Sequence, residues 1–150
     1  MTKITSKTEL LYNKSKPIDH LSVIDGITLM VKEQKEAAIV VSKAMKSIEF
    51  TINKIYERLI KNNKGRLIYV GAGTSGRIGV QDGVELYPTF NWPNNRLDYI
   101  IAGGKQAILT AIENAEDDVV TAGEIVDKKK LNSNDVVIGL AASGNTPFTC

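Results

Sequence analysis

Two short clusters of glycine and hydroxyl residues have the composition of a phosphate-binding site. Residues 71–76 read Gly-Ala-Gly-Thr-Ser-Gly, and residues 143–147 read Ser-Gly-Asn-Thr-Pro. Each cluster directly follows an apolar run that predicts a buried strand. Open α/β sheets bind ligands outside the carboxyl ends of their strands, so we expect both clusters to lie at one edge of a sheet.

The second cluster also carries a helix-start signal. Thr146 suits an N-cap and Pro147 suits the first helical position. Unpaired N–H groups at a helix start, together with the positive end of its dipole, form an anion site. Thr74 and Ser75 give the first cluster similar chemistry, and Arg77 adds a positive charge. The two clusters therefore favour a small phosphorylated and hydroxylated ligand, such as a sugar phosphate.

The first cluster also matches the Gly-x-Gly-x-x-Gly pattern of dinucleotide-binding loops. Such a site needs an acidic residue at the end of the second strand to bind the ribose. The second apolar run here ends in Ala-Gly-Gly at 102–104, and Asp98 lies at its start. A dinucleotide-binding oxidoreductase is therefore the weaker interpretation, while a tight turn that merely needs glycine stays open.

The elements that would position these clusters alternate between strands and helices. The patterns predict strands at 66–70, 97–102 and 135–141, and helices at 18–31, 33–59, 77–86, 105–115 and 118–131, with Pro88 ending the helix at 77–86. Ser22 or Asp19 could cap the first helix. The alternation predicts an α/β fold, a parallel sheet with right-handed crossovers.

The sequence divides into three parts. Residues 1–17 are polar and predict a flexible arm, residues 18–64 predict a helical segment, and residues 65–150 predict the α/β domain. The helix at 33–59 has an apolar stripe, formed by Ala37, Val41, Ala44, Ile48, Ile52, Ile55 and Leu59. This stripe either covers a sheet or makes a dimer contact.

Composition excludes several classes of function. The chain has 150 residues, with 43% hydrophobic and 24% charged residues, which is ordinary for a globular protein. A formal net charge of +2 argues against nucleic-acid binding. One cysteine, Cys150, and one histidine, His20, leave no internal disulfide and no Cys- or His-based metal site. The N-terminus lacks the apolar run of a signal peptide and no stretch is long enough to span a bilayer, so we expect a cytoplasmic protein without a membrane partner.

Several motifs occur in an order that points to one family. They are Gly-Ala-Gly-Thr-Ser-Gly-Arg-Ile-Gly at 71–79, Tyr-Pro-Thr-Phe at 87–90, Ile-Ala-Gly-Gly at 101–104, Glu-Asn-Ala-Glu-Asp-Asp at 113–118 and Ala-Ala-Ser-Gly-Asn-Thr-Pro at 141–147. From about residue 18 onward the chain resembles the N-acetylmuramic acid 6-phosphate etherases. These are sugar isomerase (SIS) domain proteins related to the glucokinase regulatory protein. The resemblance implies a SIS-type sheet, flavodoxin-like or Rossmann-like, with N-terminal helices.

The resemblance also implies a reaction and its residues. The expected reaction cleaves the lactyl ether of N-acetylmuramic acid 6-phosphate, by elimination and hydration, to N-acetylglucosamine 6-phosphate and D-lactate, with no metal or redox cofactor. Such a reaction belongs to the recycling of cell-wall amino sugars. Glu85 matches the family's acid and Glu116 its base. The residues expected to bind substrate are Gly73, Thr74, Ser75, Arg77, Ser143, Gly144, Asn145 and Thr146. The family implies a homodimer.

Glu85 raises a geometric problem, because a straight helix from Arg77 would carry it about 12–14 Å from the first cluster. Either that helix is short or bent, or a second subunit completes the site. An acid also needs a raised pKa, and Val84 and Leu86 would allow an apolar setting.

The sequence departs from the family at three points. Val84 stands where the family has serine, and Asn145 stands where it has arginine. The chain is also shorter and stops soon after its third predicted strand, which would leave an apolar edge. We therefore interpret it as the N-terminal half of an etherase, complemented by a C-terminal half. The alternatives are a non-catalytic sugar-phosphate-binding module and an inactive fragment.

Overall fold

The computed structural model describes residues 16–61 and 63–150. These residues form two compact units, 16–54 and 55–150. Residues 1–15 of the predicted arm lie outside the described residues, and the division of the chain at residues 17 and 64 stays a prediction. No helix of the described part is long and apolar enough to cross a membrane.

The first unit is helical. It contains the 3₁₀-helix η2 (Ile18–His20), α1 (Val23–Lys43) and the beginning of α2 (Met45–Lys61). The side chain of Ser22 accepts a hydrogen bond from the backbone N–H of Asp25, so the predicted cap at Ser22 is confirmed. The predicted boundary between residues 31 and 33 is wrong, because α1 continues through it. The helices instead separate at Ala44, where the backbone turns tightly and the N–H bonds to the carbonyl of Val41.

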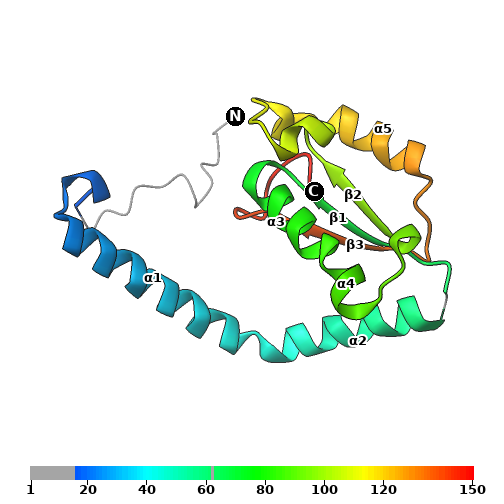
Figure 1. Ribbon diagram of the computed structural model, residues 1–150, viewed down its shortest axis with the longest axis horizontal. Helices are drawn as coiled ribbons and strands as arrows, with labels where there is room; N and C mark the ends of the chain where they lie inside the picture. Colours follow the sequence, from blue (N-terminus) through cyan, green and yellow to red (C-terminus); the bar gives the residue numbers. More distant parts are fainter. Residues whose placement is uncertain (1–15, 62) are drawn as a thin grey trace, which may run out of the picture. The chain divides into compact units, whose positions relative to one another are not determined.

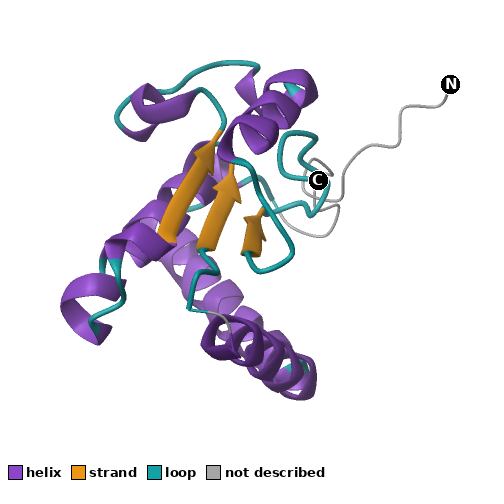
Figure 2. Ribbon diagram, turned by 90° about the vertical axis from the view of Figure 1, so that its right-hand side faces the viewer, coloured by secondary structure: helices purple, strands orange, loops and turns teal. Residues whose placement is uncertain are grey.

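The second unit is built on a three-stranded parallel sheet. Its strands are β1 (Leu67–Gly71), β2 (Leu97–Ile101) and β3 (Val136–Leu140), in the order β2-β1-β3. Figure 2 shows the three arrows pointing the same way. The sequence predicts the bounds of all three strands to within one residue. The sheet confirms the predicted parallel α/β fold, and β3 has no strand on its outer side among the described residues.

Helices lie on both faces of this sheet (Figure 1). They are α3 (Gly73–Val84), α4 (Leu86–Phe90) and α5 (Val119–Lys129). Ile68 and Ile100 are almost fully buried on the face that Ile125 of α5 covers. Tyr69 is buried on the other face, together with Leu59 near the end of α2. Successive side chains of a strand point to opposite faces, so β1, which is buried throughout, needs a helical layer on each side.

Two predicted helices differ from the structure. The segment predicted as a helix at 105–115 forms the 3₁₀-helix η4 (Gly104–Ile108), and the 3₁₀-helix η5 (Ala115–Asp117) follows. Positive φ angles at Gly103, Gly104 and Asn114 interrupt an α-helical path on both sides of that segment. Pro88 does not end the helix that begins after β1, because α3 ends at Val84 and Pro88 lies inside the short α4.

The amino ends of the strands are joined by a network of ion pairs. Arg66, just before β1, donates from Nη2 to a carboxylate oxygen of Asp135 at 2.6 Å, and Asp135 is buried beside β3. Asp98 of β2 accepts from Lys129 of α5 at 2.6 Å. The Arg66 guanidinium holds the pKa of Asp135 below its usual range. All three strands are thus fastened at the end of the sheet opposite the predicted site.

Candidate functional site

The first glycine cluster is a tight turn, and most of it belongs to a helix. β1 ends at Gly71 and α3 begins at Gly73, so this helix starts four residues before the predicted start at Arg77. A Cβ atom on Gly71 would lie 2.8 Å from Cα of Gly76, and one on Gly76 would lie 2.9 Å from the carbonyl oxygen of Gly71. Both positions therefore need glycine so that helix and strand backbones can touch.

This turn places hydroxyl groups at the amino end of α3. Thr74 and Ser75 lie in its first turn, where backbone N–H groups have no partner within the helix. Thr74 is exposed and lines a cavity, whereas the half-buried Ser75 does not line it. The dipole of this 12-residue helix makes its amino end favourable for an anion.

The cavity has a volume of about 310 Å³ and lies at the carboxyl ends of the strands. In the sheet, β2 lies on one side of β1 and β3 on the other, so the strand order reverses direction at β1. Open α/β sheets bind ligands at such a switch point, and the cavity lies there. It brings together five residues named by the sequence analysis: Gly73, Thr74, Arg77, Glu116 and Thr146. Glu113 and an apolar wall of Ala111, Ile112 and Ala115 complete much of its lining.

Arg77 holds one wall of this cavity in place. Its Nε donates to the carbonyl oxygen of Ala107 at 3.0 Å, and its Nη2 donates to that of Thr110 at 3.1 Å. In an α-helix these carbonyls would accept from residues 111 and 114, so the Arg77 contacts replace helical hydrogen bonds. Arg77 therefore positions the segment that follows β2, and its charge stays at the cavity.

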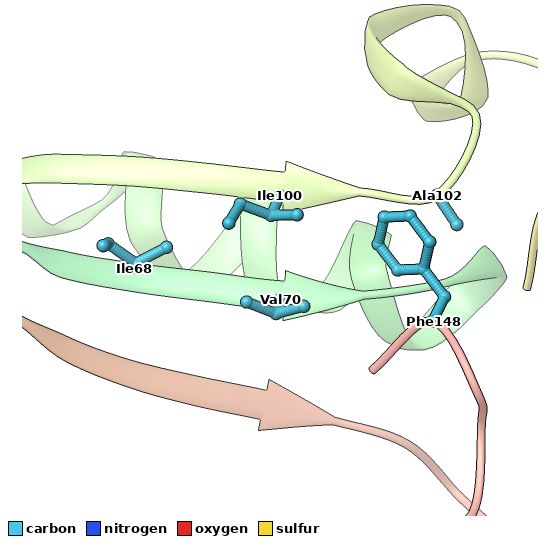
Figure 3. Packing of buried hydrophobic residues seen from close by; sticks show 5 residues of the cluster. All are labelled: Ile68, Val70, Ile100, Ala102 and Phe148. Atoms are coloured by element: carbon cyan, nitrogen blue, oxygen red, sulfur yellow. The ribbon is translucent and has the colours of Figure 1, made fainter. Parts of the chain in front are cut away.

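Glu116 reaches the cavity from η5. The positive φ of 63° at Asn114 turns the chain so that Glu113 and Glu116 both line the cavity. The backbone N–H of Phe148 donates to the carbonyl oxygen of Glu116 at 2.9 Å. The ring of Phe148 is buried beside Ile100 and Ala102, as Figure 3 shows. The C-terminal turn thus anchors the segment that carries Glu116.

The second cluster contributes less to this cavity than the sequence suggests. Thr146 lines it, but Ser143, Gly144 and Asn145 do not. The Ser143 hydroxyl accepts from the backbone N–H of Asn145 at 3.1 Å, which forms a local turn. The carbonyl of Thr146 accepts from the N–H groups of Thr149 and Cys150, which makes a single turn after the cluster.

Glu85 lies apart from the cavity. It follows α3 directly, its side chain is exposed, and it does not line the cavity. α3 is one uninterrupted helix, so the alternative of a short helix is wrong. About 11 residues separate Thr74 from Glu85, or roughly 16 Å along the helix axis. Among the described residues, no apolar surroundings bury the Glu85 side chain, although an acid with a raised pKa would need them.

A tyrosine pair anchors the end of α3 that carries Glu85. The Tyr69 hydroxyl donates to a carboxylate oxygen of Asp82 at 2.5 Å. Burial and this hydrogen bond raise the pKa of Tyr69, so its hydroxyl stays a donor. The ring of Tyr99 stacks on that of Tyr69 at 6.1 Å. Its hydroxyl lies where a Cβ atom on Gly83 would meet it at 2.6 Å.

Glu113 and the apolar wall line the cavity but are not among the site residues that the sequence predicts. Glu113 belongs to the motif at 113–118, in which the resemblance implies a role for Glu116 alone. Ala111 and Ile112 lie in the segment predicted as a helix at 105–115, and apolar residues at this spacing are typical of one helix face rather than of a cavity wall. Asp98 is paired with Lys129 and Arg66, so it is not placed to bind a ribose. Among the described residues no group of three His, Cys, Asp or Glu side chains could hold a metal ion.

Comparisons with known proteins agree with this fold. The family model of the glucokinase regulatory protein N-terminal SIS domain matches residues 51–150. The chain is 44% identical over 131 residues to the N-acetylmuramic acid 6-phosphate etherase of Pasteurella multocida, which covers 87% of this chain and 43% of that protein. It is 41% identical over 144 residues to the etherase of Lactococcus lactis, covering 96% of this chain and 48% of that protein.

The etherase of Mycoplasma mycoides is 44% identical over 142 residues, covering 95% of this chain and 46% of that protein. The chain spans about half the length of the curated relatives it matches, and the match lies in their N-terminal half. The SIS domain model matches residues 51–150, which include all three strands of the parallel sheet. The chain belongs to the family of the glucokinase regulatory protein N-terminal SIS domain and corresponds to the N-terminal half of its etherase relatives.

Proposed function

We propose that this chain forms the glutamate-bearing half of an etherase that acts on N-acetylmuramic acid 6-phosphate. The observation that carries the proposal is the cavity in which Thr74, Arg77 and Glu116 meet at the sheet's switch point. Relatives that share 41–44% of its residues are named for this activity. The products would be N-acetylglucosamine 6-phosphate and D-lactate.

The reaction assigns a separate role to each glutamate. The carboxylate of Glu116 removes the C2 proton of the open-chain sugar, which the neighbouring aldehyde makes acidic. The C3–O bond then breaks, and the departing lactate oxygen takes a proton from Glu85. Glu85, now a carboxylate, takes a proton from water, whose oxygen bonds to C3 of the unsaturated aldehyde and forms a hydroxyl group there, while Glu116 returns its proton to C2. Each general acid or base is typically worth 10² to 10⁴-fold in rate.

The phosphate is expected at the amino end of α3. Thr74 offers a hydroxyl there, and the unpaired N–H groups and helix dipole favour an anion. Ser75, Ser143, Gly144 and Asn145 stay predicted contacts, to be made by loop rearrangement or by residues that complete the site. Glu113 and Glu116 add carboxylate acceptors to the lining, to which sugar hydroxyls can donate.

Glu85 is proposed to act in the site of a second copy. Within one chain it lies at the far end of α3 from Thr74, too far for one sugar phosphate to bridge. A two-fold axis repeats every contact, so Glu85 of each copy would reach the cavity of the other. The partner surface would also supply the burial that raises the pKa of an acid.

A non-catalytic sugar-phosphate-binding module is the second candidate. The exposure of Glu85 favours it, because a binding protein needs no second carboxyl group. The cavity would then bind the ligand without breaking its ether. The two candidates differ in lactate release, but they share the binding of sugar phosphate at Thr74.

The test measures D-lactate release from N-acetylmuramic acid 6-phosphate by the chain and by Glu85→Gln and Glu116→Gln. Glu124→Gln, an exposed change on α5 outside the cavity, is the matched control. We expect the parent and the control to release lactate and both site variants to be inactive, which would show that the 150 residues suffice without a C-terminal half. Mixing the two inactive variants should restore about one quarter of the parental rate, because random pairing makes half of the dimers mixed, each with one complete site.

An active parent with an inactive mixture would contradict the shared site, provided the variants exchange subunits. An inactive parent that N-acetylglucosamine 6-phosphate stabilises against heat would assign the binding role instead. Neither release nor stabilisation would reject both candidates for the 150-residue chain.

A further inference from the structure

A second and larger cavity lies beside the outer strand β2. Its volume is about 410 Å³, and none of its lining residues lines the cavity that contains Glu116. Tyr99 and Ile100 both line it although they point to opposite faces of the sheet, so the cavity runs along the outer edge of the strand. Val80 of α3, Ile108 of η4 and Ile125 of α5 also line it. Its volume falls within the range of small-molecule sites.

The lining combines apolar walls with one uncompensated positive charge. Val80, Ile108 and Ile125 are each half-buried and present aliphatic surface. Two charged residues of the lining neutralise each other, because Lys129 donates to Asp98 at 2.6 Å. Lys105 is exposed and has no hydrogen bond or ion pair within residues 16–61 and 63–150. A ligand therefore meets a hydrophobic slot with a single ammonium group at its rim.

We propose that this cavity binds a small amphiphilic monoanion, with its carboxylate on the Lys105 ammonium and its apolar body against Val80, Ile108 and Ile125. Burying apolar surface drives the body into the slot. A carboxylate is the head group that fits, because it accepts a charge-assisted hydrogen bond from the exposed Lys105 ammonium while its chain lies against the apolar walls. A neutral head group would forgo that bond, and a cation would be repelled.

The proposal does not rest on the etherase assignment. The two cavities lie on either side of the segment that follows β2, since Lys105 and Ile108 face one and Ala107 and Ala111 face the other. A ligand beside β2 therefore contacts neither Glu116 nor Thr74. An absence of lactate release would therefore not contradict the binding site beside β2. An absence of octanoate binding would likewise not contradict the proposed etherase function.

The test uses octanoate, a linear monocarboxylate, and observes the ¹³C-labelled methyl groups of the full chain by NMR. We expect octanoate to shift the methyl signals of Val80, Ile108 and Ile125 in a saturable way. The signals of Ile112, in the other cavity, and of Val120, exposed on α5, should not move. Octanamide, which has the same chain length and no charge, should bind at least several-fold more weakly.

Lys105→Gln removes the charge and keeps most of the side chain, and it should weaken octanoate binding roughly tenfold. Lys128→Gln, an exposed change in the last turn of α5 outside the cavity, should leave the affinity unchanged. Unchanged methyl spectra without ligand would show that both variants keep the fold. The proposal would be overturned if Lys105→Gln bound octanoate as tightly as the parent, or if octanamide bound as tightly as octanoate. It would also be overturned if the methyl signal of Ile112 shifted instead, or if no signal shifted in a saturable way.

Discussion

The backbone N–H of Phe148 donates to the carbonyl oxygen of Glu116 at 2.9 Å, and this bond joins the end of the chain to the wall of the cavity. The Phe148 ring is 4% exposed and packs with Ile100 and Ala102 at the carboxyl end of β2. Glu116 itself is exposed and belongs to a 3₁₀-turn of three residues. Its position therefore depends on a residue 32 positions further along the chain.

The first prediction concerns this anchor. Phe148→Ala should lower the free energy of unfolding by about 3 kcal/mol, because a buried aromatic ring is lost and a cavity remains. Phe148→Leu, which keeps an apolar side chain of intermediate size, should cost less than half as much. Denaturant unfolding measures both values. Equal stability of Phe148→Ala and the parent would contradict the packing described for Phe148.

The second prediction concerns the contact between β1 and α3. Gly76→Ala should destabilise the chain by about 2 kcal/mol or more, because its Cβ atom would overlap backbone atoms of Gly71, which have little room to move. The control is Gly123→Ala on α5, where no atom lies within 4 Å of the added Cβ. This change should stabilise the chain by roughly 0.5–1 kcal/mol, since alanine is the better helix former.

Thermal unfolding of the two glycine variants gives the comparison. If Gly76→Ala were as stable as the parent, α3 could move away from β1 with little loss of free energy of unfolding. The first glycine cluster would then have no packing requirement, and its glycines would need another explanation.

The third prediction concerns Arg77. Arg77→Gln removes both hydrogen bonds to the carbonyls of Ala107 and Thr110, so amide hydrogen exchange should become faster across residues 104–110. Sugar-phosphate binding should weaken as well, because the wall of the cavity loses its support and a positive charge disappears. Arg77→Lys keeps the charge without the forked donor, so it should restore part of the affinity and little of the protection. Unchanged exchange in Arg77→Gln would contradict the positioning role.

The fourth prediction concerns acid stability. The pKa of Asp135 is lowered chiefly by its hydrogen bond with Arg66, so its ionised form is favoured in the folded state. This stabilisation is complete above the pKa of the unfolded chain, near 3.9, and it is lost as the pH falls through the lower folded-state pKa. Asp135→Asn should cost about 3 kcal/mol at pH 7, because the buried ion pair loses one partner.

The cost of Asp135→Asn should shrink as the pH falls from 5 to below 3. Denaturant unfolding at a series of pH values tests this slope. Asp127→Asn, which alters an exposed carboxylate on α5, should change stability little at any pH. A cost for Asp135→Asn that does not vary with pH would show that Asp135 contributes through its shape rather than its charge.

The regular elements of the second unit could be predicted because local signals and tertiary packing agree there. The three apolar runs became strands, and α5 begins at Asp118, whose side chain accepts from the N–H of Thr121. The segment at 105–115 could not be predicted, because its helical apolar spacing competes with contacts distant in sequence. Arg77 occupies two of its carbonyls, and glycines with positive φ precede it.

The candidate site could be predicted only in part. Sequence reasoning placed Thr74, Arg77, Glu116 and Thr146 in one site, and the structure brings these residues to one cavity. The sequence does not indicate that Arg77 donates to the carbonyls of Ala107 and Thr110. Nor does it indicate that Glu113 lines the same cavity as Glu116. Glu85 lies past the far end of α3, away from the cavity, as the spacing along a helix from residue 77 predicts.

The central position of β1 has a consequence for how the chain is made. β1 is synthesised before either strand that flanks it, and both of its neighbours are parallel strands that follow long crossovers. Its five residues are all buried in the finished sheet, so they leave the ribosome as an apolar segment with no strand to pair with. One edge of β1 can pair only after residues 97–101 have been synthesised, and the other edge only after residues 136–140. Nascent chains of intermediate length should therefore be the species that chaperones bind, and slowing translation between β1 and β2 should prolong that exposure.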